Sequence, residues 1–429
     1  MRKSMCLPVL MLLILTMPAL GQWLKIDTVT SGVYDDHSPQ VDHGGIGGTS
    51  FFDPTFGWVI FERNQGHGNS IAAIRYWSSR EAWDSSATTI SPASLDTEQE
   101  SPDVCSLSTY EGGNYVTTTL AAWQKKLSGI WNIWYCISDN DSAGWSQPQA
   151  LTSDSLSNRS VKIRTLSGSE LIAMWRKSNA VLYSIFDGEH LTRPETLVVS
   201  NFDSVEYDVS KNNKFVWTTL DSATGKVCLA TGKITSVVPP SMLCGDTIRF
   251  DGNIRDVASM YDWYNPFFTF DVESLGISKA HFLSCDPWSD SWTTDSINNF
   301  SYDVSTVHPS YFGPFSGPGE FWIWETQTSK DTSIVFTVHD TASTFASGHN
   351  PSMGILFLCD SIVAETTWNF TSSVAVWESV SGGYSHICGR AFLFSIIDEG
   401  VKPRTEIHEF NLSQNYPKGY VTNDAELRA

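Results

Sequence analysis

Seven short apolar runs, each ending in Phe or Trp and followed by a polar residue, recur along the chain. They are Val59–Glu62, Ala121–Gln124, Ala173–Arg176, Phe215–Thr218, Phe268–Asp271, Trp322–Glu325 and Val374–Ser379. From one closing aromatic residue to the next, the spacings are 62, 52, 42, 53, 54 and 53 residues. Nearly continuous apolar runs are typical of strands covered on both faces, and a period near fifty residues is typical of propeller repeats. The pattern therefore predicts the blades of a β-propeller.

Each repeat also contains further stretches with strand character. One precedes the apolar run and follows a Pro-containing turn in four repeats, at His37–Val41, Glu100–Val104, His308–Tyr311 and His349–Met353. Proline suits the first residue of a strand, where no ladder donor is lost. A third and a more polar fourth stretch follow the run, as in Asn132–Ser138 and Trp145–Thr152. We therefore predict that residues 22–398 form an all-β, seven-bladed β-propeller with four-stranded blades.

The stretch Trp23–Val29 alternates like a strand and stands apart from the first repeat. The seventh repeat has no obvious fourth strand before the stretch at Glu399–Arg404. We predict that residues 23–29 pair with the outer edge of the last blade and so close the ring. The alternative is an unpaired N-terminus.

Residues 1–21 have the pattern of a secretory signal peptide. Arg2 and Lys3 supply the positive region, Leu7–Met17 the apolar region, and Ala19–Gly21 the small residues before a cleavage site. The apolar run is about half of the roughly 20 residues that a membrane-spanning helix needs. We therefore predict a secreted protein, cleaved before Gln22, with no membrane span.

Composition changes this picture little. A formal net charge of −20 argues against nucleic acid or an anionic membrane as a partner. An odd number of cysteines follows the signal, so buried thiols are expected rather than a disulfide framework. One disulfide, Cys228–Cys244, stays open because those residues would lie on neighbouring strands of one blade.

The tail contains Phe410–Pro417, which reads Phe-Asn-Leu-Ser-Gln-Asn-Tyr-Pro. This run resembles the opening of the C-terminal sorting domain of the type IX secretion system. The resemblance implies export across the outer membrane of a bacterium to the cell surface or beyond. Lys418–Tyr420 departs from the motif, and the sequence ends at Ala429, so residues 399–429 are interpreted as a linker and a truncated sorting-domain start.

A second resemblance lies at Ser138–Trp145, which is similar to the Asp-box turn of sialidase-type propellers. Asn140 stands in the place of the Asp and Ser142 in the place of the Gly. Such a box is a hairpin whose Trp packs on the blade, away from a catalytic site. It implies a sialidase-like fold and does not by itself imply sialidase activity.

Catalytic chemistry has few candidates in this sequence. A carboxylate follows the aromatic residue in four repeats, as Glu62, Asp271, Glu325 and Glu378. Glycosidases need two carboxylates close together, and several of these could converge at one end of the channel. The simpler interpretation, which we favour, is that they end the strand and bond to neighbouring blades. No arginine lies in the context that sialidases use to bind the substrate carboxylate.

His37, His308 and His349 lie at or beside the first strands of their repeats. Three imidazoles near one channel could bind a metal ion, but their place in the repeat explains their similarity equally well. We therefore predict no metal and no cofactor.

The sequence favours a monomeric, non-catalytic binding module for a glycan, a peptide or an extracellular protein. The expected contact surface is the aromatic stretch containing Tyr261, Trp263, Tyr264 and Phe267, with Asn64–Ser70 as a second loop. Two alternatives stay open at this point: a sialidase-like glycoside hydrolase, and a structural surface or adhesion protein.

Overall fold

The structure is a computed structural model. It describes residues 27–30, 34–42, 56–66, 68–77, 82–95, 97–111, 114–139, 144–166, 170–210, 213–237, 240–262, 266–286, 291–296, 305–313, 321–327, 332–338, 341–363, 366–381, 383–397 and 404–409. In parts of these strands the backbone alone is described. Predictions on residues 1–21 and on the Phe410–Pro417 motif lie outside these ranges. Within the described residues, no helix is long and apolar enough to cross a membrane.

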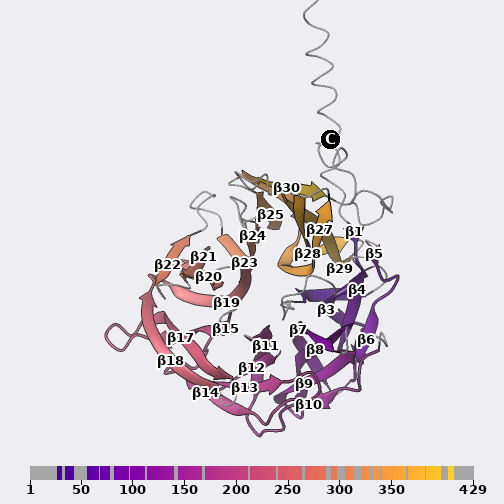
Figure 1. Ribbon diagram of the computed structural model, residues 1–429. Coiled ribbons are helices and arrows are strands. Elements are labelled where there is room, and N and C mark those ends of the chain that lie inside the picture. The colour runs from indigo at the N-terminus through magenta and orange to yellow at the C-terminus, as the bar shows by residue number, and fades with distance from the viewer. Residues whose placement is uncertain are drawn as a thin grey trace, which may run out of the picture.

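The described strands form antiparallel sheets arranged in a ring, with the chain running around it in sequence order (Figure 1). Repeat 1 contains β2 (Asp35–Val41), β3 (Phe56–Asn64), β4 (Asn69–Trp77), β5 (Ala82–Trp83) and β6 (Thr88–Ser91). Repeat 2 contains β7 (Glu98–Glu111), β8 (Asn114–Leu127), β9 (Ile130–Asp139) and β10 (Gln149–Ala150). Repeat 3 contains β11 (Asn158–Thr165), β12 (Leu171–Lys177), β13 (Ala180–Phe186) and β14 (Glu195–Val199). Repeat 4 contains β15 (Tyr207–Val209), β16 (Lys214–Leu220), β17 (Val227–Val237) and β18 (Pro240–Arg249).

The second half of the chain continues the ring. Repeat 5 contains β19 (Asn253–Asp262), β20 (Phe267–Ser274), β21 (Ile277–Cys285) and β22 (Trp292–Ser296). Repeat 6 contains β23 (Ser305–Gly313), β24 (Phe321–Gln327), β25 (Thr332–Val338) and β26 (Thr341–Ser347). Repeat 7 contains β27 (His349–Val363), β28 (Thr366–Ser381) and β29 (Tyr384–Ile397), joined by β1 (Asp27–Thr28) and β30 (Arg404–Glu409).

The predicted all-β propeller with four-stranded blades is confirmed, but the number of separate sheets is six rather than seven among the described residues. Repeats 5 and 6 share one eight-stranded sheet. They join where β19 and β23 run parallel, pairing Tyr261 with Phe312 and Asp262 with Gly313. The shared sheet arises because the innermost strands of these two repeats form ladder hydrogen bonds with each other.

The aromatic residue that closes each apolar run is buried, as expected for a strand covered on both faces. These residues are Phe61, Trp123, Trp175, Trp217, Phe270, Trp324 and Trp377. Successive side chains of a strand point to opposite faces. In β12, Ala173 and Trp175 accordingly pack against repeat 2, whereas Ile172 and Met174 pack against repeat 4. The core therefore lies between neighbouring sheets, and burying each large apolar side chain there contributes about 1.5–3 kcal/mol.

The prolines of the first strands do not begin those strands, contrary to the prediction. Pro39 lies inside β2, where the ladder register shifts between His37 and Gln40. The residue before the proline has a positive φ, 51° at Ser38. A β-bulge leaves one residue without a ladder partner, so a proline there loses no hydrogen bond. The same bulge recurs in most other repeats, with positive φ at Ser101, Ser160, Asp256 and Asn350.

The N-terminal strand pairs with the last sheet, as predicted for residues 23–29, of which the structure describes 27–29. β1 is antiparallel to β29, with Asp27 opposite Gly389. The backbone N–H groups of Val29 and Thr30 donate to the carbonyl of Ile387 at 2.8 and 3.1 Å. The Val29 side chain is buried in the cluster that joins repeats 1 and 7. β30, within the stretch interpreted as a linker, pairs with a different part of β29.

The described cysteines are free and buried, as expected: Cys105, Cys136, Cys228, Cys285 and Cys388. β17 and β18 are neighbours, but Cys228 lies opposite Arg249 and Cys244 lies opposite Gly232. The Cys228–Cys244 disulfide is therefore not formed, because the register does not place the two residues opposite each other.

The ends of the Asp-box-like turn lie where a hairpin requires them. Ser138 and Trp145 form an antiparallel bridge, and the Trp145 ring lies 4.9 Å from that of Trp58. The box thus fixes repeat 2 against repeat 1. Residues 140–143 lie outside the described ranges.

Candidate functional site

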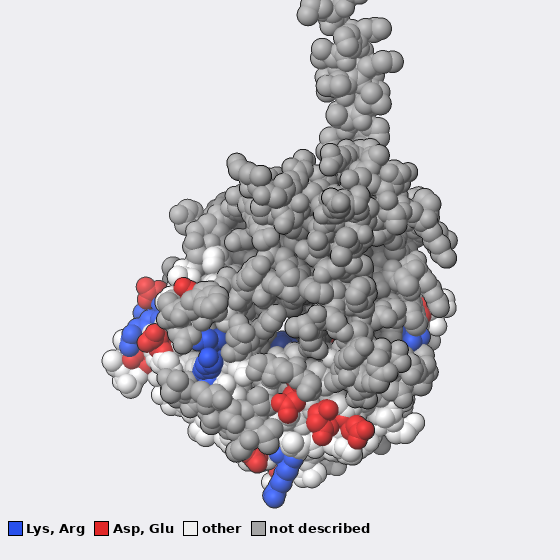
Figure 2. Space-filling model, in the orientation of Figure 1, with Lys and Arg blue, Asp and Glu red and all other residues white. Residues whose placement is uncertain are grey.

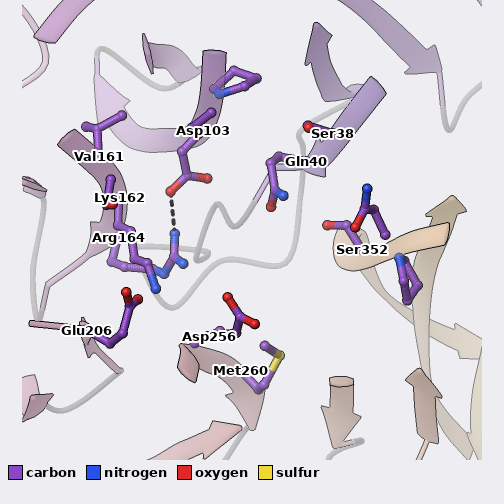
Figure 3. Close-up of a pocket in the computed structure, with 16 residues that line it drawn as sticks. Ser38, Gln40, Asp103, Val161, Lys162, Arg164, Glu206, Asp256, Met260 and Ser352 are labelled. Carbon is purple, nitrogen blue, oxygen red and sulfur yellow. Dashed lines mark hydrogen bonds and ion pairs between the residues drawn. The ribbon is translucent and has the colours of Figure 1, made fainter. Parts of the chain in front are cut away.

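The described residues line a pocket of ≈390 Å³ at the centre of the ring, built by the innermost strands of several repeats. Its lining includes Ser38, Gln40, Ser101, Asp103, Ser160, Lys162, Arg164, Glu206, Asp256, Met260, Asn350 and Ser352. In Figure 3 the side chains of Gln40, Glu206 and Asp256 point into the space between the strands. We call this the axial pocket.

The rim of the axial pocket comes from the bulges of the first strands. Its members are Ser38, Ser101, Ser160, Asp256 and Asn350. Two residues further along, a second layer differs from repeat to repeat. It contains Gln40, Asp103, Lys162, Ala258 and Ser352. The backbone pattern thus repeats in repeats 1, 2, 3, 5 and 7 while the side chains of the second layer change, so a ligand bound here would meet a different second-layer group from each of these five repeats.

Below this space, a network around Arg164 joins four consecutive repeats. Its Nη1 donates to Asp103 Oδ2 at 2.8 Å, its Nη2 to Asp208 Oδ2 at 2.8 Å, and its Nε to Ser259 Oγ at 2.9 Å. Lys162 Nζ lies 3.7 Å from Asp208 Oδ2 and donates to the carbonyl of Val257. We call these residues the floor network. Figure 3 shows the contact between Arg164 and Asp103.

The charges of the floor network stabilise one another. Burial lowers the pKa of Arg164, but the carboxylates of Asp208 and Asp103 outweigh this effect, and the pKa lies above its ordinary value. Burial raises the pKa of Asp208, but Arg164 and Lys162 outweigh it, and the pKa lies below its ordinary value. Arg164 and Asp208 thus each favour the ionised form of the other, and their contacts join neighbouring repeats.

Most rim residues are positioned by the preceding repeat. The residue after the closing aromatic accepts a hydrogen bond from the bulge N–H of the next repeat. These bonds, which we call seam contacts, are Ser101 N to Glu62 (2.9 Å), Ser160 N to Gln124 (2.9 Å), Asn350 N to Glu325 (2.9 Å) and Ser38 N to Glu378 (2.6 Å). The sequence-based interpretation of Glu62, Glu325 and Glu378 as residues that bond to neighbouring blades is therefore confirmed. The expectation that they end their strands is wrong, because β3, β24 and β28 continue to Asn64, Gln327 and Ser381. Asp271 is buried on β20.

Repeat 4 departs from this scheme. Its first strand pairs with β16 without a register shift, and Tyr207 lies opposite Trp217. Repeat 3 has Arg176 where repeats 1, 2, 6 and 7 have Glu or Gln, and Arg176 Nη1 lies 3.7 Å from Glu206 Oε1. The acidic partner has thus moved to the following repeat, where Glu206 also lines the axial pocket. Burial, with a smaller contribution from Asp256, raises the pKa of Glu206 against the opposing effect of Lys162.

Of the aromatic residues predicted to bind a ligand, the structure describes the side chain of Phe267 alone. It is buried, stacks on Phe282 at 5.3 Å and packs against Trp324. The backbone of Tyr261 lies in β19, directly after the pocket residue Met260. The side chains of Trp263 and Tyr264 lie outside the described residues.

Two of the three predicted histidines lie at seams. His37 Nδ1 is 3.2 Å from Glu378 Oε2, and His349 Nδ1 is 3.4 Å from Glu325 Oε1. Each thus pairs with a different carboxylate, while the side chain of His308 lies outside the described residues. Within the part of the chain that the structure describes, no group of His, Cys, Asp and Glu could hold a metal ion.

Sequence reasoning missed the pocket residues Gln40, Lys162, Glu206 and Asp256. Of these, Gln40 alone follows a Ser-Pro copy of the first strand. Lys162, Glu206 and Asp256 belong to repeats 3 to 5, whose first strands lack the proline, so the sequence offers no shared motif for them. On the face shown in Figure 2, acidic and basic side chains of described residues are interspersed.

No protein family and no curated protein matches the chain. Among solved structures, the propeller domain of the Trilobed protease from Pyrococcus furiosus is 9% identical over 90% of this chain and 97% of that chain, with a TM-score of 0.44. A mutant Aleuria aurantia lectin with α-methyl-L-fucoside is 9% identical over 73% and 95%, with a TM-score of 0.41. A NanB sialidase mutant from Streptococcus pneumoniae is 9% identical over 85% and 68%, with a TM-score of 0.36. These similarities concern the fold, and they do not distinguish a lectin from an enzyme.

Proposed function

We propose that this protein is a secreted or cell-surface β-propeller that binds a glycan in the axial pocket without catalysing a reaction. The observation that carries this proposal is the variety of polar side chains around the ≈390 Å³ space, with hydroxyls, amides and carboxylates supplied by separate repeats. Pockets for small ligands have volumes of about 300–1,000 Å³. A sugar needs many partners, because each hydroxyl buried without a hydrogen bond costs free energy.

The contacts of the repeated carboxylates also favour binding over catalysis. Glu62, Glu325 and Glu378 accept hydrogen bonds from the neighbouring repeat, so they hold the ring together. The two cations of the pocket, Lys162 and Arg164, are matched by Asp103 and Asp208. The carboxyl groups of Glu206 and Asp256 also line the pocket, and the remaining lining offers hydroxyls and amides for hydrogen bonds.

The proposal also covers the number of blades, the location of the protein outside the cell and its monomeric state. The two halves of the eight-stranded sheet each have four strands, which supports a count of seven blades. Residues 1–21 and the Phe410–Pro417 motif support export, and the protein is proposed to act as a monomer. An extracellular protein that presents a polar segment to the pocket is the second kind of partner.

A glycan array followed by calorimetry with the bound sugar tests this function. Replacing Gln40 by Ala removes a side chain that points into the pocket, and affinity should fall roughly fivefold to tenfold for one lost hydrogen bond. The matched control is Gln147→Ala, because Gln147 is exposed just before β10 and lies outside both the pocket and the Asn64–Ser70 loop. Binding that is unchanged in Gln40→Ala would place the ligand elsewhere, and an empty array would reject glycan binding.

Glycoside hydrolysis is a second candidate, favoured by one observation. The carboxyl groups of Glu206 and Asp256 line the same pocket, and burial raises the pKa of Glu206 as a general acid requires. Release of reducing sugar by the parent protein, lost in a folded Glu206→Gln variant, would establish this reaction. Silence in both the binding and the hydrolysis assays would leave a structural surface or adhesion role.

A further inference from the structure

The seam between repeats 7 and 1 combines two features that other described seams show separately. Its carboxylate contacts rim residues of both repeats, as Glu62 does with Ser38 and Ser101, and it also contacts a histidine, as Glu325 does. Glu378 Oε1 accepts a hydrogen bond from the backbone N–H of Ser38 at 2.6 Å and another from Asn350 Nδ2 at 2.6 Å. Ser38 belongs to repeat 1 and Asn350 to repeat 7, and both line the axial pocket. Glu378 therefore sets the spacing of two rim residues that lie far apart in the sequence.

A titratable side chain contacts the other oxygen of this carboxylate. His37 Nδ1 lies 3.2 Å from Glu378 Oε2, and the imidazole is 41% exposed while Glu378 is 8% exposed. The hydrogen bond to Glu378 raises the pKa of His37, an effect that burial opposes. Despite burial, the bonds from His37, Asn350 and Ser38 lower the pKa of Glu378.

We propose that Glu378 is the positioning residue of the axial pocket, and that His37 makes its hold on Ser38 and Asn350 respond to pH. This inference rests on the proposed function only in taking the axial pocket as the ligand site. Between the titrations of the two groups, His37 is cationic and Glu378 anionic, and the carboxylate is fixed from both oxygens. When His37 loses its proton, the charge that fixes Oε2 disappears and the rim loosens.

Other charged groups near this seam do not replace His37. Asp35, on the same strand as His37, and Glu62 on β3 are both acidic, so they favour the protonated imidazole. His349 on β27 contacts Glu325 on β24. The response to pH is therefore assigned to the contact between His37 and Glu378.

The neighbouring seams supply matched comparisons. Gln124 accepts the hydrogen bond of Ser160 N at 2.9 Å, so an amide can make a seam contact that does not titrate. Glu325 accepts from Asn350 N and lies beside His349, so it resembles the proposed site. It does not join Ser38 to Asn350, and His349→Gln is therefore the control for His37→Gln.

Nuclear magnetic resonance of the amide groups of Ser38, Ser101 and Asn350, followed from pH 4 to 9, tests the proposal. In the parent protein we expect Ser38 N–H and the Asn350 side-chain amide to shift together as His37 titrates. His37→Gln should abolish that shift. The control His349→Gln should leave the shift of Ser38 N–H unchanged. In Glu378→Gln both reporters should become independent of pH, while Ser101 behaves as in the parent.

A Ser38 amide that does not respond as His37 titrates, or that responds equally in His37→Gln, would overturn the proposal. No ligand enters this measurement, so its failure is distinct from failure of glycan binding. Conversely, if the amide shifts appear as expected but the glycan array stays empty, the proposed ligand is rejected and the role of Glu378 stands.

Discussion

The floor network and the seam contact of Glu378 both position the first strands around one pocket, but they differ in burial and in charge. Arg164 is 9% exposed and Asp208 is 0% exposed, and they join repeats 3 and 4. His37 is 41% exposed, and its partner Glu378 joins repeats 1 and 7. A buried pair stays charged at ordinary pH, whereas a partly exposed imidazole titrates near neutrality. The contact between repeats 3 and 4 is therefore independent of pH in the ordinary range, whereas the contact between repeats 7 and 1 responds to pH.

The largest expected effect comes from breaking the floor network. Arg164→Met leaves Asp103 and Asp208 buried without their main cation, and removing one partner of a buried ion pair costs about 3–5 kcal/mol. Chemical denaturation should show this loss in the free energy of unfolding. Arg193→Met is the control, because Arg193 is exposed and should change stability by less than about 0.5 kcal/mol. Equal losses in both variants would show that the network is not structural.

The pairing of the N-terminal strand β1 with β29 of repeat 7 gives the next largest effect. Deleting residues 22–30 removes the burial of Val29 and its hydrogen bonds to Ile387. Burying one such side chain contributes about 1.5–3 kcal/mol, and the hydrogen bonds from Val29 and Thr30 contribute about 0.5–1.5 kcal/mol each. The sum is about 2.5–6 kcal/mol, and the compactness of the unfolded chain places the expected loss toward its lower end. An unchanged melting temperature would refute ring closure by this strand. Val199→Ser, at an exposed apolar residue, is the control.

The pH dependence of stability should distinguish the two regions. Because the pKa of His37 is raised, its contribution is complete below its ordinary value of 6.5 and is lost as pH rises through the raised value. Because the pKa of Glu378 is lowered, its contribution is complete above 4.5 and is lost as pH falls through the lowered value. The difference in stability between the parent and His37→Gln should therefore be greatest between pH 4.5 and 6.5.

Thermal melts of the two proteins from pH 3 to 9 measure this difference. The floor network should contribute no slope between pH 5 and 9, because the pKa of Arg164 is raised and that of Asp208 is lowered. If the difference in stability between the parent and His37→Gln stays constant from pH 3 to 9, the contact between His37 and Glu378 does not make this seam respond to pH.

The sequence predicts the ring better than the pocket, for a physical reason. Burial between sheets selects apolar and aromatic residues with the period of the repeat, so Trp123 and Trp377 are visible as copies of one position. The closing strand is visible because Trp23–Val29 alternates, and Ser138–Trp145 because the box retains its spacing.

Other features depend on geometry that no local pattern records. The parallel pairing of Tyr261 with Phe312 decides that repeats 5 and 6 share a sheet. The pocket residues Lys162 and Asp256 differ from their counterparts in the other repeats, so periodicity cannot find them. The seam contacts were predictable in kind, since the carboxylate after the aromatic residue in four repeats suggested a bond to the neighbouring blade. Their donors at the bulges were not predictable.

The smallest expected effect comes from a comparison of two seam contacts that have the same geometry but opposite pKa shifts. Glu62 accepts from Ser101 N as Glu378 accepts from Ser38 N, yet burial raises the pKa of Glu62 whereas the bonds from His37, Asn350 and Ser38 lower that of Glu378. Ionised Glu62 is thus disfavoured in the folded state, so the contribution of Glu62 to stability falls as pH rises. The contribution of Glu378 to stability increases as pH rises, because its ionised form is favoured in the folded state. As pH rises from 3 to 7, Glu62→Gln should therefore gain stability relative to the parent, mainly above pH 4.5, while Glu378→Gln loses it, mainly below pH 4.5, each by about 1 kcal/mol or less. Urea midpoints at the two pH values would measure this, and changes of the same sign in both variants would mean that His37 does not distinguish the seams.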